Sequence, residues 1–328
     1  MLIASWLHDL RRGIRQHRSF RSASRRQPAY GYPSLAAEIF ENRVMLSAVT
    51  YVGGVLTVDL SSNDDVSIRP NGDNFEVQIN DVVDEVTGAA SDVTTIVVNG
   101  GGGSNIIDLS AVKPSEFTSL SSVTLKGEDA GDDIKGSGIG DLINGGRGFD
   151  TLNGKSGDDT INGDAGNDKL LGGAGKDQLN AGDGEDTVRG QGARDTINGD
   201  AGNDFLYGVE AGDTIDGGAG HDMIQAGDAD DLINGGSGDD DLHGDGGIDT
   251  INGGTGEDVL WSGTGAPSGQ TEALDGGPDC DLVDGVLDPG CEPSGAGGGG
   301  GGAGGGDEDP LRETEPLWPG TTVSTRQT

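Results

Sequence analysis

The chain is poor in the residues that usually build a compact core. Three Trp, four Tyr and six Phe are its only aromatic residues among 328, whereas 64 residues are glycine. Large apolar side chains supply most of the area that globular proteins bury. An ordinary compact domain of this length is therefore not expected.

Positive charge is scarce outside the first 48 residues. The formal net charge is −37; residues 1–48 hold eight Arg against three acids, so the rest of the chain carries −42. Low hydrophobicity combined with high net charge favours disorder unless a partner neutralises the charge. Nucleic acid is excluded as that partner, because its phosphates would be repelled.

Motifs of membrane insertion and catalysis are also missing. No apolar run approaches the roughly 20 residues that a transmembrane helix needs. The four His form no His-Glu-x-x-His motif, and no Gly-x-Ser-x-Gly elbow occurs, which argues against a metalloprotease and a lipase. We therefore expect a protein that is not an enzyme.

Residues 127–261 repeat one nine-residue unit fifteen times without an insertion or a deletion. Residues 145–153 are a clean copy, Gly-Gly-Arg-Gly-Phe-Asp-Thr-Leu-Asn. The first position is Gly in thirteen copies and Ala in two, the sixth is Asp in all fifteen, and the eighth is Ile, Leu or Val in all fifteen. So strict a period predicts a repeat architecture.

Each unit reads as six residues of turn followed by a strand of three. In such a strand the eighth-position aliphatic side chain points inward, and the seventh and ninth positions point outward. The glycines allow positive φ in the turn. One aliphatic residue in nine makes too thin a core to offset the entropy cost of ordering the chain. Something other than apolar burial must stabilise the array.

The sixth-position Asp column supplies a candidate. If successive units alternate between two parallel sheets, every second turn lies on the same edge, one strand spacing of about 4.8 Å away. Two carboxylates and glycine-rich backbone carbonyls then converge between stacked turns. An oxygen-only cage of this charge suits Ca²⁺ better than Mg²⁺, and Zn²⁺ would need His or Cys. Fifteen units allow up to about thirteen calcium ions by this geometry.

The consensus Gly-Gly-x-Gly-x-Asp-x-aliphatic-x resembles the RTX, or haemolysin-type, calcium-binding repeat. The resemblance implies an all-β fold, a right-handed parallel β-roll or β-solenoid that is disordered without calcium and folded with it, in exported bacterial proteins. It also assigns the ligands to the sixth-position residues Asp132, Asp141, Asp150, Asp159, Asp168, Asp177, Asp186, Asp195, Asp204, Asp213, Asp222, Asp231, Asp240, Asp249 and Asp258. For any single Asp, the alternative is an Asx-turn residue that caps its own backbone.

Some units depart from the consensus. The fourth position holds Ile139 in the second unit, and Ala130, Ala193, Ala211 and Ala229 in others. Val209 and Glu210 make the unit 208–216 atypical, and Arg194 places a cation beside a ligand. We expect the sites formed by these turns to be weaker or empty.

Residues 49–126 show alternating runs rich in β-branched residues. The runs cover 55–60, 64–68, 75–79 and 94–98, and turn residues such as Gly53-Gly54 separate them. Residues 100–108 form a weakened copy of the unit, with Asn105 in place of Asp. We therefore expect a β-rich cap of broader solenoid coils that covers the first repeat. A separate small sandwich is the alternative.

The two ends of the chain read differently from its middle. Residues 1–48 are expected to be a basic targeting or processing segment, because residues 40–48, Phe-Glu-Asn-Arg-Val-Met-Leu-Ser-Ala, resemble the Leu-Glu-x-Arg-x-Leu-Leu-Ser-Ala motif of exported proteins in some environmental bacteria. The alternative is a disordered basic arm with no targeting role. Residues 294–328 are rich in glycine and read as a flexible, disordered tail.

Residues 262–293 are expected to close the array. Residues 276–284 form a degenerate sixteenth unit, with Asp281 as a further ligand. In an exported protein Cys280 and Cys291 could form a disulfide that closes a short loop; two free thiols are the alternative. This segment would serve as the C-terminal cap that a solenoid needs.

Together these features predict a secreted, extracellular or cell-envelope calcium-binding β-roll that is not an enzyme. The first alternative is an adhesin or matrix component that binds a glycan or a surface partner through outward Thr, Asn and aromatic residues such as Tyr207 and Trp261. The remote alternative is a secreted hydrolase with an unrecognised site in residues 49–126.

Overall fold

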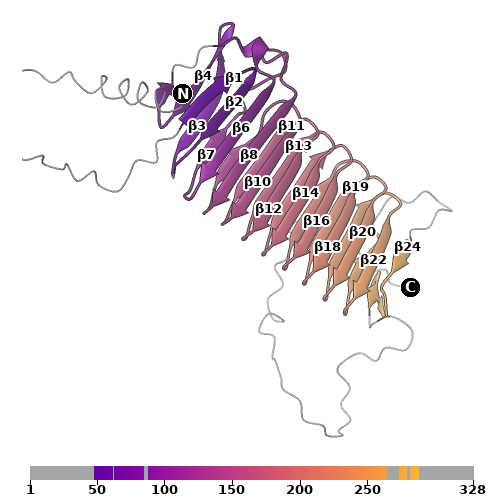
Figure 1. Ribbon diagram of the computed structural model, residues 1–328. Coiled ribbons are helices and arrows are strands. Elements are labelled where there is room, and N and C mark those ends of the chain that lie inside the picture. Colours follow the sequence, from indigo (N-terminus) through magenta and orange to yellow (C-terminus); the bar gives the residue numbers. More distant parts are fainter. Residues whose placement is uncertain (1–47, 62, 85–87, 264–272, 279–280, 288–328) are drawn as a thin grey trace, which may run out of the picture. The chain divides into compact units, whose positions relative to one another are not determined.

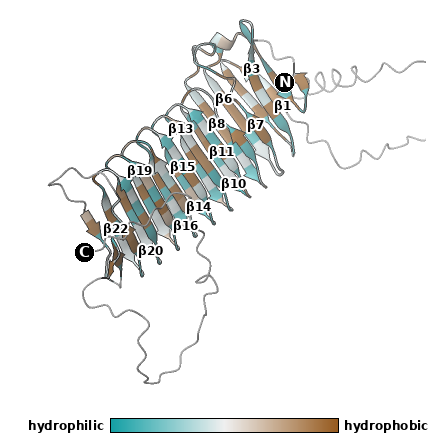
Figure 2. Cartoon of the chain, turned by 180° about the vertical axis from the view of Figure 1, so that it is seen from behind, coloured by the Kyte–Doolittle hydropathy of each residue, from teal (hydrophilic) through white to brown (hydrophobic). Residues whose placement is uncertain are grey.

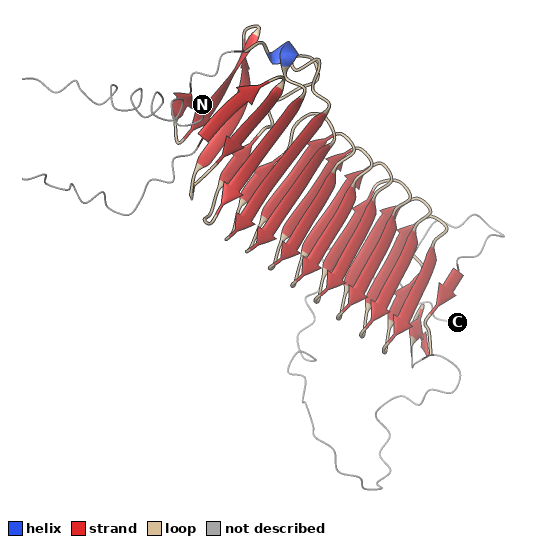
Figure 3. Ribbon diagram, viewed as in Figure 1, coloured by secondary structure: helices blue, strands red, loops and turns tan. Residues whose placement is uncertain are grey.

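The computed structural model describes residues 48–61, 63–84, 88–263, 273–278 and 281–287. They form an all-β parallel solenoid of about eight turns, in which the chain passes alternately through two sheets (Figure 1). The only helical segment in these residues is η1, a 3₁₀ turn at Ala90–Asp92 (Figure 3). None of the described helices is long and apolar enough to cross a membrane. The predicted all-β solenoid is confirmed.

The first sheet has twelve strands and the second has fourteen. In spatial order, the first sheet consists of β1 (Ala48–Val52), β2 (Val55–Asp59), β6 (Thr95–Gly101), β8 (Ser122–Asp129), β10 (Asp141–Arg147), β12 (Thr160–Ala165), β14 (Gln178–Asp183), β16 (Thr196–Ala201), β18 (Thr214–Ala219), β20 (Leu232–Ser237), β22 (Thr250–Thr255) and β24 (Ala273–Asp275). The second consists of β26 (Val286–Leu287), β25 (Leu282–Val283), β23 (Val259–Trp261), β21 (Asp241–Gly246), β19 (Met223–Asp228), β17 (Phe205–Val209), β15 (Thr187–Gly192), β13 (Lys169–Ala174), β11 (Thr151–Ser156), β9 (Asp133–Lys135), β7 (Ile106–Asp108), β3 (Asp65–Asn71), β4 (Asn74–Ile79) and β5 (Val82–Asp84).

Strands of the array pair in parallel with a shift of two units. Ile143 faces Ile161, and Ile161 faces Leu179, so equivalent positions 18 residues apart lie side by side. The eighth-position residues are buried, and they line the space between the two sheets as one continuous core. Apolar and polar residues accordingly alternate along the strands (Figure 2). The predicted alternation of units between two sheets is confirmed.

The predicted strand length of three residues was too short. Most strands of the array have six residues, because pairing continues through the first three positions of the next unit. Lys155, at a second position, still faces Gly173 of the neighbouring strand despite its positive φ of 79°. The first position is therefore a second inward position, which explains why only Gly or Ala stands there; Ala181 and Ala226 are fully buried.

Residues 49–126 continue both sheets and do not form a separate sandwich. β2, β6 and β8 extend the first sheet in parallel, and β3 and β7 extend the second. The outermost pairings at this end are antiparallel: β1 with β2, β3 with β4, and β4 with β5. Tyr51, Phe75 and Phe117 pack together at this end with ring centroids 5.3 and 6.3 Å apart. These contacts cover the first coil of the solenoid.

Several sequence predictions fall outside the described residues. They are the basic segment up to residue 47, both cysteines of the predicted disulfide and the glycine-rich tail.

Candidate calcium-binding edges

The sixth-position aspartates lie where each turn enters its strand, and they form two rows. Because alternate units enter alternate sheets, each row runs along one edge of the solenoid. Edge 1 carries Asp132, Asp150, Asp168, Asp186, Asp204, Asp222, Asp240, Asp258 and Asp281, and edge 2 carries Asp141, Asp159, Asp177, Asp195, Asp213, Asp231 and Asp249. All sixteen are at most 4% exposed. The residues predicted as ligands are thus brought together in two buried columns.

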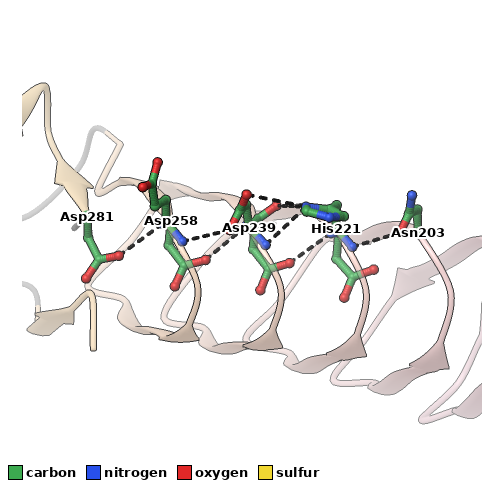
Figure 4. A network of polar contacts seen from close by, with 8 residues as sticks. Asn203, His221, Asp239, Asp258 and Asp281 are labelled. Atoms are coloured by element: carbon green, nitrogen blue, oxygen red, sulfur yellow. Dashed lines mark hydrogen bonds and ion pairs between the residues drawn. The ribbon is translucent and has the colours of Figure 1, made fainter. Parts of the chain in front are cut away.

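In each stacked pair of aspartates, Oδ1 of the second Asp accepts a hydrogen bond from the backbone N–H of the first. The N–H of Asp186 donates to Oδ1 of Asp204 at 2.8 Å, and the same bond recurs between neighbours along both edges at 2.6 to 3.0 Å. The bond from Asp258 to Asp281 (Figure 4) extends edge 1 into the degenerate unit. Each Asp therefore caps the turn before it and is held in one orientation.

The row on edge 1 also extends into the N-terminal cap. The N–H of Asn105 donates to Asp132 at 2.7 Å, and the N–H of Asp64 donates to the Asn105 side chain at 3.1 Å. Asn105 thus takes the place of an Asp, as its position in the weakened repeat predicts. Asp64 was missed, because no glycine-rich unit surrounds it; its place follows only from the pairing of β3 with β7.

The second carboxylate oxygen defines the candidate site. In the described residues, Oδ2 is buried without a hydrogen-bond partner in Asp132, Asp150, Asp159, Asp168, Asp177, Asp186, Asp195, Asp204, Asp213, Asp222, Asp231, Asp240 and Asp281. Buried polar atoms normally have a partner, and a buried charged oxygen without one is costly. The repetition of this atom along both edges points to a missing cation.

The surroundings of Oδ2 are made of oxygen and glycine. A Cβ on Gly127 would lie 2.3 Å from Oδ2 of Asp132 and 2.5 Å from the carbonyl oxygen of Gly145 in the next turn. The missing side chain therefore leaves room where a carboxylate and a carbonyl converge. In the described part of the chain no three His, Cys, Asp or Glu side chains cluster as a metal site, so a metal here must take backbone carbonyls as ligands. Calcium, which prefers many oxygen ligands, fits this donor set.

The electrostatics of the columns favour a bound cation. Burial raises the pKa of Asp204 to about 7, the N–H of Asp186 partly offsets this, and the neighbouring carboxylates of Asp186 and Asp222 raise the pKa further. Burial likewise raises the pKa of Asp159 to about 8. At neutral pH the metal-free array must hold many of these groups protonated or bear their repulsion. A divalent cation removes that conflict.

This conflict predicts an unusual pH dependence. A folded-state pKa above the ordinary value of 3.8 means that the stabilising contribution is fully present below about pH 4 and is lost as pH rises through about 6 to 8. In chelator, the β signal in circular dichroism should therefore increase when pH falls from about 8 to about 5. With calcium present, a lower pH should instead destabilise the array, because protons compete with calcium for the carboxylates. The calcium concentration at half-folding should therefore rise as pH falls. A metal-free array that gains β structure toward pH 8 would contradict this assignment.

Asp141 differs from the other aspartates. Its two carboxylate oxygens accept hydrogen bonds from the backbone N–H and the hydroxyl of Ser137 at 2.6 and 2.8 Å. Neither Ser137 nor Ile139 has the positive φ of its counterparts, and the N–H of Gly138 donates to Val112 of the cap at 2.9 Å. Ile139 thus disturbs the turn as predicted; a weak or empty calcium site there remains a prediction.

A second ladder, which sequence reasoning missed, runs through the fifth positions. On edge 1 the side chain of Asn203 accepts from the N–H of His221, and Nδ1 of His221 accepts from the N–H of Asp239, at 2.9 and 3.1 Å (Figure 4). These acceptors belong to the preceding turn, whereas the sixth-position acceptors belong to the following turn. The sequence could have indicated this ladder, because Asn and Asp are common at the fifth position and their side chains readily accept hydrogen bonds from nearby backbone N–H groups.

Comparison with known proteins agrees with this geometry. A profile described as the RTX calcium-binding nonapeptide repeat, in four copies, matches residues 135–170, 171–206, 207–242 and 234–266. No curated protein matches the chain. Residues 135–266 are therefore RTX calcium-binding nonapeptide repeats, a type of repeat typical of secreted bacterial proteins.

Proposed function

We propose that the protein is a secreted, non-enzymatic calcium-binding β-roll whose folding is coupled to calcium. The observation that carries this proposal is the repeated buried Oδ2 without a partner along both edges. The chain's own aspartates would hold the ions, with first-position carbonyl oxygens such as that of Gly145 beside them. The metal would supply positive charge between stacked turns, and the fixed Oδ1 bonds would keep each carboxylate oriented toward it.

A role outside the cell accords with the character of the repeats and with the exported-protein motif in residues 40–48. Extracellular fluids commonly hold enough calcium to fill sites of modest affinity, in the range of about 10⁻⁴ to 10⁻³ M. The absence of a recognisable catalytic motif supports a structural or binding role.

The proposal is tested by measuring calcium binding directly. Equilibrium dialysis or titration calorimetry of the full chain should show several calcium ions bound per chain, because the two edges repeat the same donor set. Magnesium at the same concentration should bind far less, since it retains its waters and demands a stricter octahedron. A chain that binds no calcium, or binds both ions equally, would defeat the proposal.

A second candidate function, adhesion to a neutral glycan surface, has one specific observation in its favour. On the outward face of the first sheet from β10 to β22, the seventh and ninth positions are uncharged except for Asp216 and consist mainly of Thr and Asn, although the chain as a whole is strongly acidic and the second positions add Asp164 and Asp200 to this face. Side-chain amides link Asn144, Asn162, Asn180 and Asn198 into a hydrogen-bonded ladder. A rigid, uncharged array of hydroxyl and amide groups suits polysaccharide hydroxyls better than a charged partner.

Glycan binding by the calcium-loaded chain would distinguish the candidates. Asn180→Asp places a charge in the ladder and should reduce binding, whereas Asn153→Asp, at the same position on the second sheet, should not. Equal binding by both variants would remove the support for adhesion through this face. Hydrolysis of a glycan by the full chain would instead favour the remote enzymatic alternative in residues 49–126.

A further inference from the structure

The two edges of the solenoid differ in the glycine that forms each turn. On edge 1 the fourth position is Ala130 in the first turn and glycine in every later turn from Gly148 to Gly256, with φ between 123° and 148° for these glycines. On edge 2 glycine stands at that position only in Gly157, Gly175 and Gly247. The other edge 2 turns place Ile139, Ala193, Ala211 and Ala229 there. The first position does not distinguish the two edges, because edge 1 has one Ala there, Ala181, and edge 2 has one, Ala226.

The backbone ladder between turns follows the same division. On edge 1 the fourth-position N–H donates to the third-position carbonyl of the next turn in every pair from Gly148 to Gly238, at 2.7 to 2.8 Å. On edge 2 the bond from Gly175 to Gly192 lengthens to 3.5 Å. Within the described residues, no equivalent bond forms from Ala193 or Ala211. The turns around Asp195 and Asp213 are therefore not tied together as their counterparts are.

Backbone strain also occurs in these two turns, as it does at Ala130 and Ala229 in others. Val209 has a φ of 94°, which is an outlier for a β-branched residue, and Ala193 and Ala211 have φ of 77° and 68°. The fifth-position ladder also stops there, because Arg194 and Gly212 offer no side-chain acceptor. These two stacked turns of edge 2 thus lack the fourth-position ladder of edge 1 and the side-chain bonds that join several of its fifth positions, and they keep the sixth-position bond from Asp195 to Asp213, at 2.7 Å.

A protein cation lies at this interruption. The guanidinium Nη2 of Arg194 is 3.2 Å from where a Cβ on Gly212 would be, directly beside Asp213. Burial raises the pKa of Asp213 to about 6, and both the N–H of Asp195 and the charge of Arg194 act in the opposite direction. Lys176, at the same fifth position one edge 2 turn earlier, has no comparable effect on the pKa of Asp195 in the turn that follows it.

We propose that the two edges bind calcium unequally: from Asp150 onward edge 1 forms an uninterrupted series of sites, and on edge 2 the positive charge of Arg194 disfavours calcium between Asp195 and Asp213. This inference rests on the proposed calcium-binding function and deepens it. Edge 1 fills first as calcium rises. Edge 2 fills in two separate segments, on either side of Arg194.

The test compares two cation-removing variants of the full chain. Arg194→Gln should bind about one more calcium ion per chain than the unchanged protein, because an oxygen-lined gap loses its competing charge. Lys176→Gln is the matched control, on the same edge and at the same position, and should leave the number of bound ions unchanged. Equal stoichiometry in the two variants would overturn the inference.

A second pair of variants tests the edges themselves by equilibrium dialysis. Asp186→Asn on edge 1 alters a carboxylate shared by two filled gaps, whereas Asp195→Asn alters one that borders the interruption on one side, so Asp186→Asn should lose more bound ions than Asp195→Asn. Loss of the same number of ions from both would also overturn the inference. If the unchanged protein binds no calcium, the proposed function itself fails. If it binds calcium and the variants do not differ as stated, only the inequality of the edges fails.

Discussion

Removal of calcium should abolish the β structure of the array. In EGTA the circular dichroism of the full chain should be largely that of a coil, and calcium should restore the β signal cooperatively at roughly 10⁻⁴ to 10⁻³ M. The physical reason is the composition of the interior. Each unit buries one aliphatic side chain and a Gly or Ala, together with one carboxylate. Apolar burial alone does not offset the cost of ordering nine residues and packing like charges.

The control for this experiment separates specific binding from screening. Sodium chloride at matched ionic strength weakens repulsion between exposed charges but does not coordinate a buried Oδ2. It should therefore restore little of the β signal. Full β structure in EGTA would overturn the coupling of folding to calcium. Recovery in sodium chloride equal to that in calcium would overturn the assignment of the sites.

Gly166→Ala should strongly destabilise the calcium-loaded array. The φ of Gly166 is 146°, and an added Cβ would lie 1.4 Å from the carbonyl oxygen of Gly148 in the stacked turn. The strained φ and the overlap each cost energy, so a loss of about 3 kcal/mol or more is expected. The calcium concentration at half-folding, followed by circular dichroism, should rise accordingly.

Gly192→Ala is the matched control, because it adds the same methyl group within the array. Its Cβ would meet only the carbonyl of Gly173, at 3.6 Å, an ordinary contact. This variant should therefore keep nearly the same calcium midpoint. Equal midpoints for the two alanine variants would show that the close approach of the turns at Gly166 does not hold in solution.

The repeat made much of this fold predictable. Strict spacing of the aspartates and of residues such as Ile161 fixes which side chains face inward and which positions stack, because a single rule applies to every unit. The alternating run at 75–79 likewise predicted β4 almost to the residue. The two rows of candidate ligands followed from the same spacing, including Asp281 and the substitution by Asn105.

Features that depend on contacts between different turns could not be read from one unit. Ser137 bonds both carboxylate oxygens of Asp141 in a turn that contains Ile139 and whose Gly138 is bonded to Val112 of the cap. Arg194 appeared in the sequence as a cation beside its own Asp195, whereas the structure places it over the next turn of the same edge. The grouping of the irregular turns on edge 2 emerges only when the units are assigned to alternate edges.

The stacking of turns also determines length. Each 18-residue coil advances the folded array by only one strand spacing of about 4.8 Å, whereas the same coil as an extended chain spans roughly 60 Å. A calcium-free coil is not fully extended, and its mean span grows only with the square root of its length. If calcium controls folding, it therefore shortens the mean distance between the segments joined to the two ends of the array by about twofold and removes the longer reach that the extended chain allows. A calcium-rich medium would hold those segments close together, and a calcium-poor one would let them move far apart.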